Sequence, residues 1–582
     1  MSTAVSHQPH APNNIHTHIR DLYRLHFSHE LAAGTLKPLV VPYSLLGTVV
    51  LPILYFSIPH TNRPWLYRAR YPLWALILVF NLHEAVTSSS ANFAVGYAVG
   101  LMQAWGILWT ATLLIWMSPQ FEAERVERRK RTTTGSEQPV AGGTASGVSV
   151  NGDAAKGMKN VRRLQANTPT AATRQQGPQG RAREAPDETV ARSLAEGYEY
   201  YWQSYPAAAP FLARLGWSYD LVTSFRGTGW NWTVPIIPHF SRPDKPLSSS
   251  PVDIHSIPLC TRQGYRRFTT RRAFARAQLL PLVLGYLALD AIIVLMVKDP
   301  HFILGPDFAA EAAEKATASP STGPLPRPLT LPPFLAALPP PVLFTYRAML
   351  CFSAIFTAIE LIMTLWQLAC LYLLPLGTRA ELWHYPSTHG AFAPTVLDRG
   401  LAGFWGGWWH QTFRVAFGAP AARLAARGWL PDPQRSRRGR AAAGLLAFAQ
   451  SAFLHSLGSV SCLPASRAWA PPVFFMLAWA GVLVQEAACA AWARAAGGVF
   501  VLPRAARRAA NLAFVFAWLC GTQYWFCDDL ARAGIWLLEP VPASPLRALG
   551  LGMPGDSWLR WDPFLWPRWH VGRHWWESGL AL

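Results

Sequence analysis

The sequence predicts an all-α, polytopic integral membrane protein with about eight transmembrane helices. Hydrophobic residues make up 51% of the chain and charged residues only 14%, whereas about a quarter of the residues in soluble domains are charged. Apolar runs also approach the roughly twenty residues that a helix needs to cross a bilayer. These runs lie at residues 38–58, 71–83, 93–117, 277–297, 342–376, 443–462, 472–493 and 511–526.

The positive charge of the chain is distributed as in a membrane protein. The formal net charge is +20 at pH 7, which by itself would suit a nucleic-acid partner. The arginines, however, gather between the apolar runs, at residues 63–70, 125–131, 262–276, 423–440 and 504–508. The positive-inside rule places these segments in the cytosol. Residues 298–341 carry mostly acidic charges and are predicted to be lumenal, as is the N-terminus by alternation, and no nucleic-acid partner is expected.

Five regions follow from this pattern. Residues 1–37 form an N-terminal tail, 38–120 the N-terminal spans, 121–193 a disordered cytosolic insert, 194–537 the main membrane domain and 538–582 a C-terminal tail. Within the insert, residues 131–191 are rich in Thr, Gly, Gln, Ala and Pro and nearly lack aromatic residues, so they cannot bury a core. Residues 310–341, rich in Pro and Ala, are predicted to be a lumenal linker.

No metal site and no disulfide framework are expected. The early histidines are irregularly spaced in a terminal segment, at His7, His10, His16, His18, His26 and His29. Five of the seven cysteines lie in or beside apolar runs, where a thiol behaves as a small hydrophobic group.

The run at residues 443–462, AGLLAFAQSAFLHSLGSVSC, places His455 in the middle of an apolar segment. Ionisable side chains at that depth are costly, and they mark functional sites. On a helical period Ser451, His455 and Ser459 share one face, with Gly458 and Cys462 beside them. Such a face would line a reaction chamber. The alternative is a structural histidine that is hydrogen-bonded to a neighbouring helix.

Three further segments are unusually specific: LGWSYDLVTSFRGTGWNW at 215–232, GFWGGWWHQTFR at 403–414 and WLCGTQYWFCDDLARAGIW at 518–536. Aromatic residues at span ends usually form interface belts. Trp405, Trp408 and Trp409 are nearly contiguous, so they point in several directions and some must face protein or ligand. The HYPSTHGAF stretch at 384–392 precedes them.

The other two segments each hold charged residues. Arg226 stands beside flexible glycine positions, where it would either meet a phosphate or cap a helix at the membrane surface. Asp528 and Asp529 are predicted to pair with Arg532 at the membrane surface.

Together these motifs resemble fungal members of the wax-synthase-like branch of the membrane-bound O-acyltransferases. The resemblance covers about residues 194–536 and rests on Trp217, Asp220, Leu221, Arg226, Gly227, Gly229, Trp230, Phe404, Trp405, Trp409, His410, Gln411, His455, Asp528, Asp529, Gly534 and Trp536. It implies that His455 is the catalytic base and that His410 is the second catalytic residue. The chain departs from the family at Gly406 and Gly407, where basic residues are usual, and at Ser456, where a glutamate is usual.

The resemblance implies acyl transfer from acyl-CoA to a hydroxyl in the endoplasmic reticulum membrane, with no bound cofactor. Many fungal relatives look like tailoring enzymes that acetylate terpenoid or meroterpenoid alcohols, so we expect acetyl-CoA as co-substrate and an apolar secondary metabolite as acceptor. The residues expected to bind the substrate or acyl-CoA are Trp405, Trp409, Gln411, Arg226, Trp230, Ser451 and Ser459. A neutral His455 would accept the hydroxyl proton, and His410 or an indole N–H would stabilise the oxyanion.

Other functions remain open at this point. Within the same class, the alternative is a long-chain wax or sterol ester synthase. In another class, a transporter would use Asp290, Glu360 and Glu486 as an intramembrane proton relay. Against a transporter stand the missing internal repeats and the Trp-His segment, for which transport has no special need. A scaffold without activity is the third option.

Overall fold

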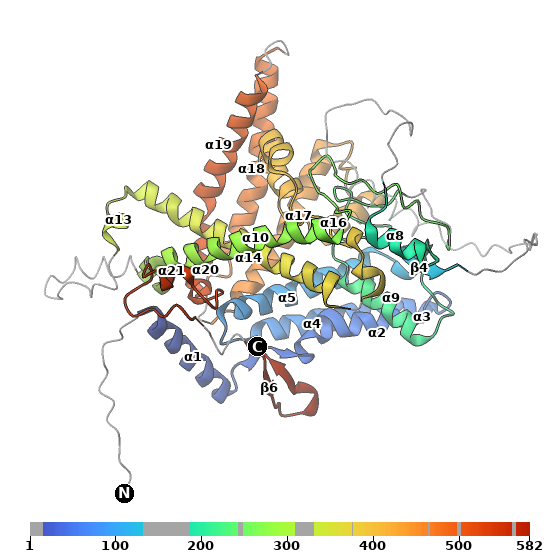
Figure 1. Ribbon diagram of the computed structural model, residues 1–582, viewed down its shortest axis with the longest axis horizontal. Coiled ribbons are helices and arrows are strands. Elements are labelled where there is room, and N and C mark those ends of the chain that lie inside the picture. Colours follow the sequence, from blue (N-terminus) through green and yellow to red (C-terminus); the bar gives the residue numbers. More distant parts are fainter. Residues whose placement is uncertain are drawn as a thin grey trace, which may run out of the picture.

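A computed structural model describes residues 15–131, 185–241, 248–308, 331–374, 376–463, 466–497, 502–560 and 566–582. The predicted linker at 310–341 and the insert at 121–193 lie largely outside these residues, as do His7 and His10. The protein is a mostly helical, multi-pass membrane protein (Figure 1). Its long helices are α4 (Arg70–Thr87), α5 (Phe93–Ala111), α10 (Arg271–Met296), α14 (Pro340–Tyr372), α17 (Arg437–Val460), α18 (Ala470–Ala495) and α19 (Arg504–Thr522).

The remaining helices, one of which also has 19 residues, connect and cap these. They are α1 (Ile15–Ala33), α2 (Leu51–Ser57), α3 (Pro64–Arg68), α6 (Pro119–Glu122), α8 (Glu188–Ala195), α9 (Phe211–Thr223), α11 (Pro300–Leu304), α13 (Pro333–Ala336), α15 (Asp398–Gly403), α16 (Arg414–Ala426), α20 (Tyr524–Arg532) and α21 (Pro545–Ala548). The strands are β1 (Lys37–Pro38), β2 (Val40–Val41), β3 (Ser88–Ser89), β4 (Arg125–Lys130), β5 (Tyr198–Gln203), β6 (Arg568–His570) and β7 (Gly579–Ala581).

Five helices in the described ranges are long and apolar enough to cross a membrane. They are Phe93–Trp116, which continues α5 through a π-helical turn, and α10, α14, α17 and α18. This differs from the eight predicted spans. The apolar run at 38–58 is divided between short helices, and α19 begins with Arg504, Arg507 and Arg508, which lower its hydropathy. Exposed leucines on α10, such as Leu280 and Leu284, form the kind of apolar outer face that lipid covers.

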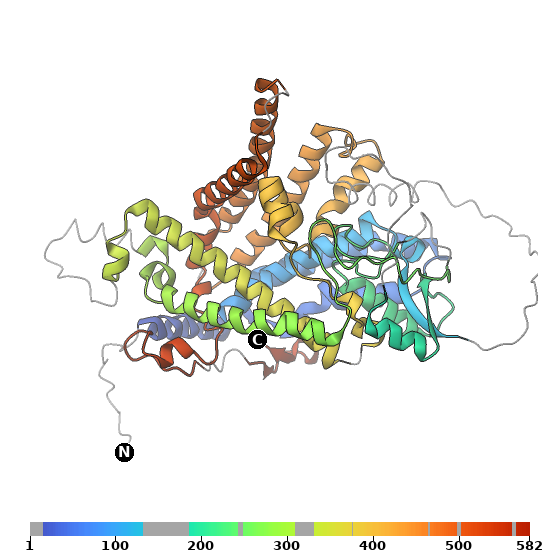
Figure 2. The same ribbon diagram turned by 45° about the horizontal axis from the view of Figure 1, so that its top comes forward.

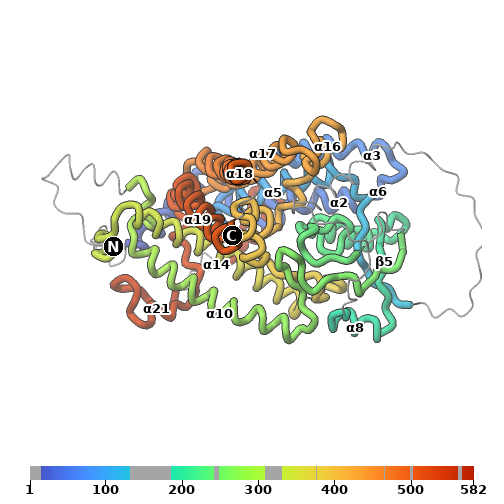
Figure 3. Tube along the Cα trace, turned by 90° about the horizontal axis from the view of Figure 1, so that it is seen from above, coloured from blue at the N-terminus to red at the C-terminus, as the bar shows by residue number. Residues whose placement is uncertain are grey.

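The helices that carry the site pack side by side. Helix α17 packs on both α5 and α18, and α4 packs on α5. Helix α10 packs on α14 (Figure 3). Helices α1 and α20 both contact α11 at one end of the molecule, while β4, α8 and α9 lie at the other end (Figures 1 and 2). The predicted lumenal segments thus share one end with the N-terminal helix. Which end faces the cytosol stays a prediction.

Both ends of the 121–193 region are ordered, which corrects the predicted extent of the insert. Strand β4 pairs antiparallel with β5, from Arg125 opposite Gln203 to Lys130 opposite Tyr198. Helix α8 follows the undescribed residues and is capped by the Asp187 side chain. The β4 sequence, RVERRK, is almost entirely charged, so neither its hydropathy nor its composition indicates a strand.

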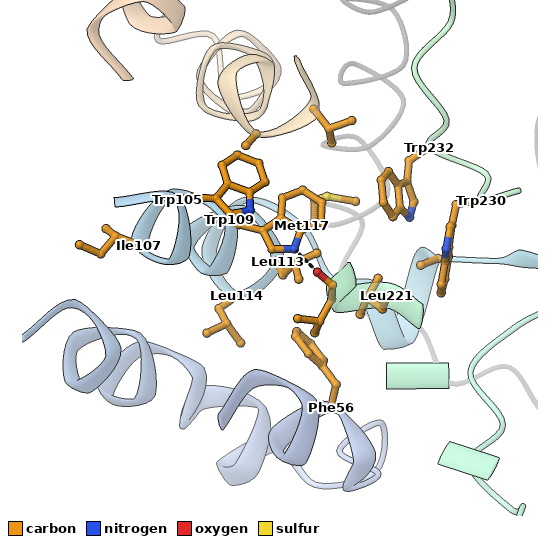
Figure 4. Packing of buried hydrophobic residues seen from close by; sticks show 14 of the residues in the cluster. Phe56, Trp105, Ile107, Trp109, Leu113, Leu114, Met117, Leu221, Trp230 and Trp232 are labelled. Carbon is orange, nitrogen blue, oxygen red and sulfur yellow. Dashed lines mark hydrogen bonds between the residues drawn. The ribbon is translucent and has the colours of Figure 1, made fainter. Parts of the chain in front are cut away.

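Tryptophans join the N-terminal helices to the main domain in one core. Trp105 and Trp109 of α5 stack on each other with centroids 5.5 Å apart, and the Trp109 indole N–H donates to the carbonyl oxygen of Val222 at 2.7 Å (Figure 4). Trp232 packs on Trp109 from the loop after α9. The N-terminal helices and the main domain therefore position each other.

Candidate active site

His455 is held at one ring nitrogen and free at the other. It lies on α17 and is half-buried, and its Nδ1 lies 3.0 Å from the hydroxyl of Tyr97 on α5. The imidazole stacks on Phe475 at 4.8 Å and meets the edge of Phe526 at 5.1 Å. Within the described part of the chain, Nε2 has no hydrogen-bond partner. The predicted catalytic histidine is therefore oriented, with one nitrogen available.

The contacts of the Tyr97 hydroxyl are compatible with the tautomer of His455 that a general base requires. The Tyr97 hydroxyl also lies 3.5 Å from the backbone carbonyl oxygen of His455, to which it donates. With its proton directed there, the phenol oxygen can accept a hydrogen bond from Nδ1–H. That tautomer leaves the lone pair of the imidazole on Nε2, which is the form that a general base requires.

Small residues allow Tyr97 to reach His455. A Cβ on Gly458 would lie 2.8 Å from the Tyr97 ring, and one on Gly100 would lie 1.8 Å from the carbonyl oxygen of Leu457. The Ser461 hydroxyl donates to the carbonyl oxygen of Gly96 at 2.6 Å and accepts from the Gly100 N–H at 2.8 Å. Close contact at small residues is typical of membrane helix pairs, and here it sets the distance from the phenol to the imidazole.

Buried acids fix the end of α17, which corrects the predicted pairing of Asp528 and Asp529 with Arg532. Asp529 accepts from the Ser459 hydroxyl at 2.5 Å and from the Arg467 N–H at 2.8 Å. Asp528 lies 3.4 Å from His301 Nε2. Arg532 instead pairs with Asp307 at 2.7 Å. Ser459 is only 1% exposed, so it anchors the helix rather than lining an open chamber.

The aromatic rings of the segment at 403–414 pack in two directions, toward α18 and toward α14. Residues Phe404–Trp408 form a π-helical turn, a local distortion that is common at functional sites. Trp405 packs on Phe475, the residue that also stacks on His455. Trp408 stacks on Phe356 of α14 at 5.2 Å. The structure thus agrees with the expectation that these tryptophans do not all face lipid.

Two buried polar atoms in this segment have no partner among the described residues, namely the Trp405 indole N–H and His410 Nδ1. Burial and the nearby His389, His455 and Arg226 lower the pKa of His410 to about 3, so the ring is neutral at pH 7. His410 packs on Trp409 at 5.3 Å, Trp409 packs on Trp405, and Trp405 packs on the Phe475 ring that stacks on His455. His410 and His455, which are 45 positions apart in the sequence, therefore belong to the same site.

Arg226 brings a cation to this region. Its Nη2 donates to the carbonyl oxygen of Ser387 at 3.0 Å, and its Nε is buried without a partner in the described ranges. Burial lowers the pKa of the guanidinium. It lies in a loop rather than on a surface helix, which favours the phosphate-binding interpretation over a cap. The loop can turn here because Gly227 has a φ of +63°, and a Cβ there would lie 2.4 Å from Trp232.

Other residues predicted to bind substrate have packing contacts. Trp230 is 2% exposed and lies between Trp217 and Trp232, so we assign it to the core. Gln411 closes the turn after Trp409, because its amide donates to the Trp409 carbonyl oxygen at 2.5 Å. Ser451 lies one helical turn before His455 and is half-buried.

The acids proposed for a proton relay do not contact one another. Asp290 accepts from the Ser544 hydroxyl at 2.5 Å, Glu360 lies 2.9 Å from His389 Nδ1, and Glu486 is exposed. Among the described residues no group of three or more His, Cys, Asp and Glu side chains is placed to hold a metal ion.

Sequence reasoning missed Tyr97 and His389. Tyr97 lies in an apolar run 358 positions before His455, and the only local signal is its pair of flanking glycines, Gly96 and Gly100. His389 lies in the quoted HYPSTHGAF stretch, but only the fold shows that it contacts Glu360.

The fold and the site define a multi-pass membrane protein with a histidine site enclosed by aromatic residues. Residues 388–477 match the model of the membrane bound O-acyl transferase family. The match contains His389, His410 and His455, and it supports membrane-bound O-acyltransferase activity. No curated protein and no solved structure matches the chain.

We expect Tyr97→Phe to lower kcat without a comparable change in KM. The variant keeps the ring but removes the hydroxyl that orients His455, and one hydrogen bond contributes about 1 kcal/mol, or roughly a fivefold change. Steady-state kinetics in microsomes measure this effect. Tyr219→Phe, an exposed tyrosine on α9, is the control. Unchanged kcat in Tyr97→Phe would show that the tyrosine does not orient the base.

Proposed function

We propose that the protein is an acyl-CoA-dependent O-acyltransferase that acetylates a hydroxyl of an apolar secondary metabolite, of the terpenoid or meroterpenoid kind. The observation that carries the proposal is the Nε2 of His455, which has no hydrogen-bond partner in the part of the chain that the structure describes, on a ring whose other nitrogen is held by Tyr97. The family match over residues 388–477 supports the reaction class. The acetyl donor and the acceptor class rest on the resemblance to fungal wax-synthase-like enzymes.

His455 acts as the general base in this proposal. Its Nε2 takes the hydroxyl proton as the alcohol oxygen attacks the thioester carbonyl carbon. Negative charge then develops on the carbonyl oxygen, and the unpartnered N–H of Trp405 and the ring of neutral His410 are the nearby groups that can donate to it. Collapse of the tetrahedral intermediate expels the CoA thiolate, so no acyl-enzyme is required.

Arg226 is the group that meets the acyl donor. CoA carries phosphates, and a guanidinium with a free N–H is suited to bind them. The donor enters from the cytosolic side of the endoplasmic reticulum membrane in this scheme, where the arginine-rich loops are predicted, while the apolar acceptor enters from the bilayer.

Comparison of metabolite profiles tests the substrate class. Deleting the gene should leave total wax and sterol esters unchanged, while one hydroxylated metabolite accumulates and its acetate ester disappears. Adding the accumulated alcohol and acetyl-CoA to microsomes that contain the protein should release CoA. A fall in long-chain esters would favour the wax or sterol ester synthase. Uptake of a solute by proteoliposomes without CoA would favour the transporter.

A further inference from the structure

We propose that His389, held by Glu360, is the acid that protonates the leaving thiolate of the acyl donor. This inference rests on the proposed function. The Nδ1 of His389 lies 2.9 Å from Oε1 of Glu360, which comes from α14. The His389 side chain is only 6% exposed, and its Nε2 is buried with no partner among the described residues. The geometry is therefore a carboxylate–imidazole pair with one unused ring nitrogen.

The surroundings of His389 place this pair beside the site. Its ring packs on Phe356 at 4.8 Å, Trp408 at 5.6 Å and Trp409 at 6.0 Å. Trp405, in the same π-helical turn, packs toward the Phe475 ring that contacts His455. Trp409 also packs on Trp405 at 6.2 Å, so contacts between these rings connect the His389 side with the His455 side.

His410 and Arg226 link the Glu360–His389 pair to the site of the proposed reaction. The His389 ring packs on Trp409 at 6.0 Å, and Trp409 in turn packs on His410 at 5.3 Å. Arg226, which we assign to the phosphates of the donor, donates to the carbonyl oxygen of Ser387 at 3.0 Å, and the Ser387 hydroxyl donates to the carbonyl oxygen of His389 at 3.1 Å. The leaving group would therefore depart on the side where the cation and the Glu360–His389 pair lie, while the acceptor hydroxyl is activated on the His455 side.

The carboxylate gives His389 the properties of an acid. Glu360 accepts Nδ1–H and stabilises the imidazolium, as the carboxylate does in other carboxylate–histidine pairs. The proton on Nε2 is then the one available for transfer. An alkyl thiol such as that of cysteine has a pKa of about 8.5. Its thiolate is therefore a fairly basic leaving group, and a proton delivered to the sulfur assists its departure.

Two proton transfers accompany the transfer of the acyl group. The acceptor O–H bond breaks and its proton moves to Nε2 of His455, while the oxygen forms a bond to the carbonyl carbon. The C–S bond breaks, its electron pair goes to sulfur, and sulfur takes the Nε2 proton of His389. Water then carries one proton from His455 back to His389. The net reaction is an alcohol and a thioester giving an ester and a thiol.

The alternative is that the pair only ties α14 to the chain around His389. A tie of that kind would affect all substrates equally. A leaving-group acid, in contrast, matters only when the leaving thiolate is basic, because a weakly basic thiolate departs without a proton. Dependence on the leaving group therefore separates the two interpretations.

The experiment compares His389→Gln with wild type for two donors, acetyl-CoA and an acetyl nitrothiophenyl thioester, whose thiol is far more acidic. We expect kcat with acetyl-CoA to fall by about a hundredfold, the lower range for acid catalysis, and kcat with the aryl thioester to change by less than about threefold. Glu360→Gln should show the same donor dependence with a smaller loss. His83→Gln, an exposed histidine on α4, is the control.

The measured pattern of losses separates the role of His389 from that of His455. An equal loss of kcat with both donors, or no loss with either, overturns the leaving-group role. A rise in KM alone also overturns it, because that result indicates binding. His455→Ala should reduce kcat with both donors. If His455→Ala keeps its activity while His389→Gln shows the donor-dependent loss, the assigned base is wrong and the leaving-group acid stands.

Discussion

Replacing His455 with alanine is expected to abolish ester formation while the protein still inserts and folds. General-base catalysis contributes about 10²–10⁴-fold, so kcat/KM should fall by at least a hundredfold. The side chain is half-buried and hydrogen-bonded only to Tyr97 among the described residues, so its removal leaves few unpaired groups behind. Ester formation from acetyl-CoA and the accumulated alcohol, measured in microsomes with equal protein levels, gives the result.

A matched variant separates chemistry from packing. His83→Ala removes an exposed imidazole from α4, another long helix, and should leave activity unchanged. Activity above a few per cent in His455→Ala would show that another group accepts the hydroxyl proton. A loss of protein in His455→Ala but not in His83→Ala would instead indicate a structural histidine, the alternative that the apolar segment at 443–462 allows.

The sequence predicts the helix that carries His455 well, because hydropathy is a local property. The run at 443–462 corresponds to α17, Arg437–Val460, and the N-terminal extension is the arginine-rich turn that Ser436 caps. The last predicted span, 511–526, is less accurate. Helix α19 ends at Thr522 and the chain continues into α20, which holds Asp528 and Asp529 inside the protein.

Contacts between distant segments account for most of what the sequence does not reveal. Periodicity shows which face of a helix is polar, but it does not show which helix covers that face. Tyr97 meets His455 only because α5 and α17 pack closely at their glycines. Asp220 is visible in the motif at 215–232, yet its ion pairs with Arg125, at 3.0 Å, and with Arg379 depend on three separate segments.

Buried side chains explain why both flanks of the predicted insert are ordered, because Val126 of β4 lies in one buried cluster with Tyr200 and Trp202 of β5. Arg129 pairs with Glu199 at 2.6 Å across β4 and β5, and its guanidinium lies over the Tyr201 ring. Strand β4 is mostly charged and β5 is mostly aromatic and polar. The strand that stabilises β4 follows it in the sequence only after the undescribed residues 132–184. The composition of one segment does not show which distant strand it pairs with, so it does not predict cross-strand pairs of this kind.

The second large effect is expected at Gly100, where even one added carbon has no space. An alanine Cβ would lie 1.8 Å from the carbonyl oxygen of Leu457 and 2.7 Å from the Ser461 hydroxyl. The first of these atoms is backbone, so α5 and α17 must move apart. Overpacking costs about 1–3 kcal/mol when side chains can adjust, and a backbone clash should exceed that range. Gly100→Ala should therefore lower the melting temperature of the detergent-solubilised protein markedly and abolish activity.

Gly216 on α9 provides the matched control, because a Cβ there would meet nothing within 4 Å. Alanine at an exposed helical position replaces the more flexible glycine, so Gly216→Ala should be neutral or stabilising by up to about 1 kcal/mol. Comparing the two variants removes the general effect of glycine in a helix and leaves the contact between α5 and α17. If Gly100→Ala is as stable and as active as Gly216→Ala, the two helices are not in close contact. The approach of Tyr97 to His455, on which the oriented base depends, would then be wrong as well.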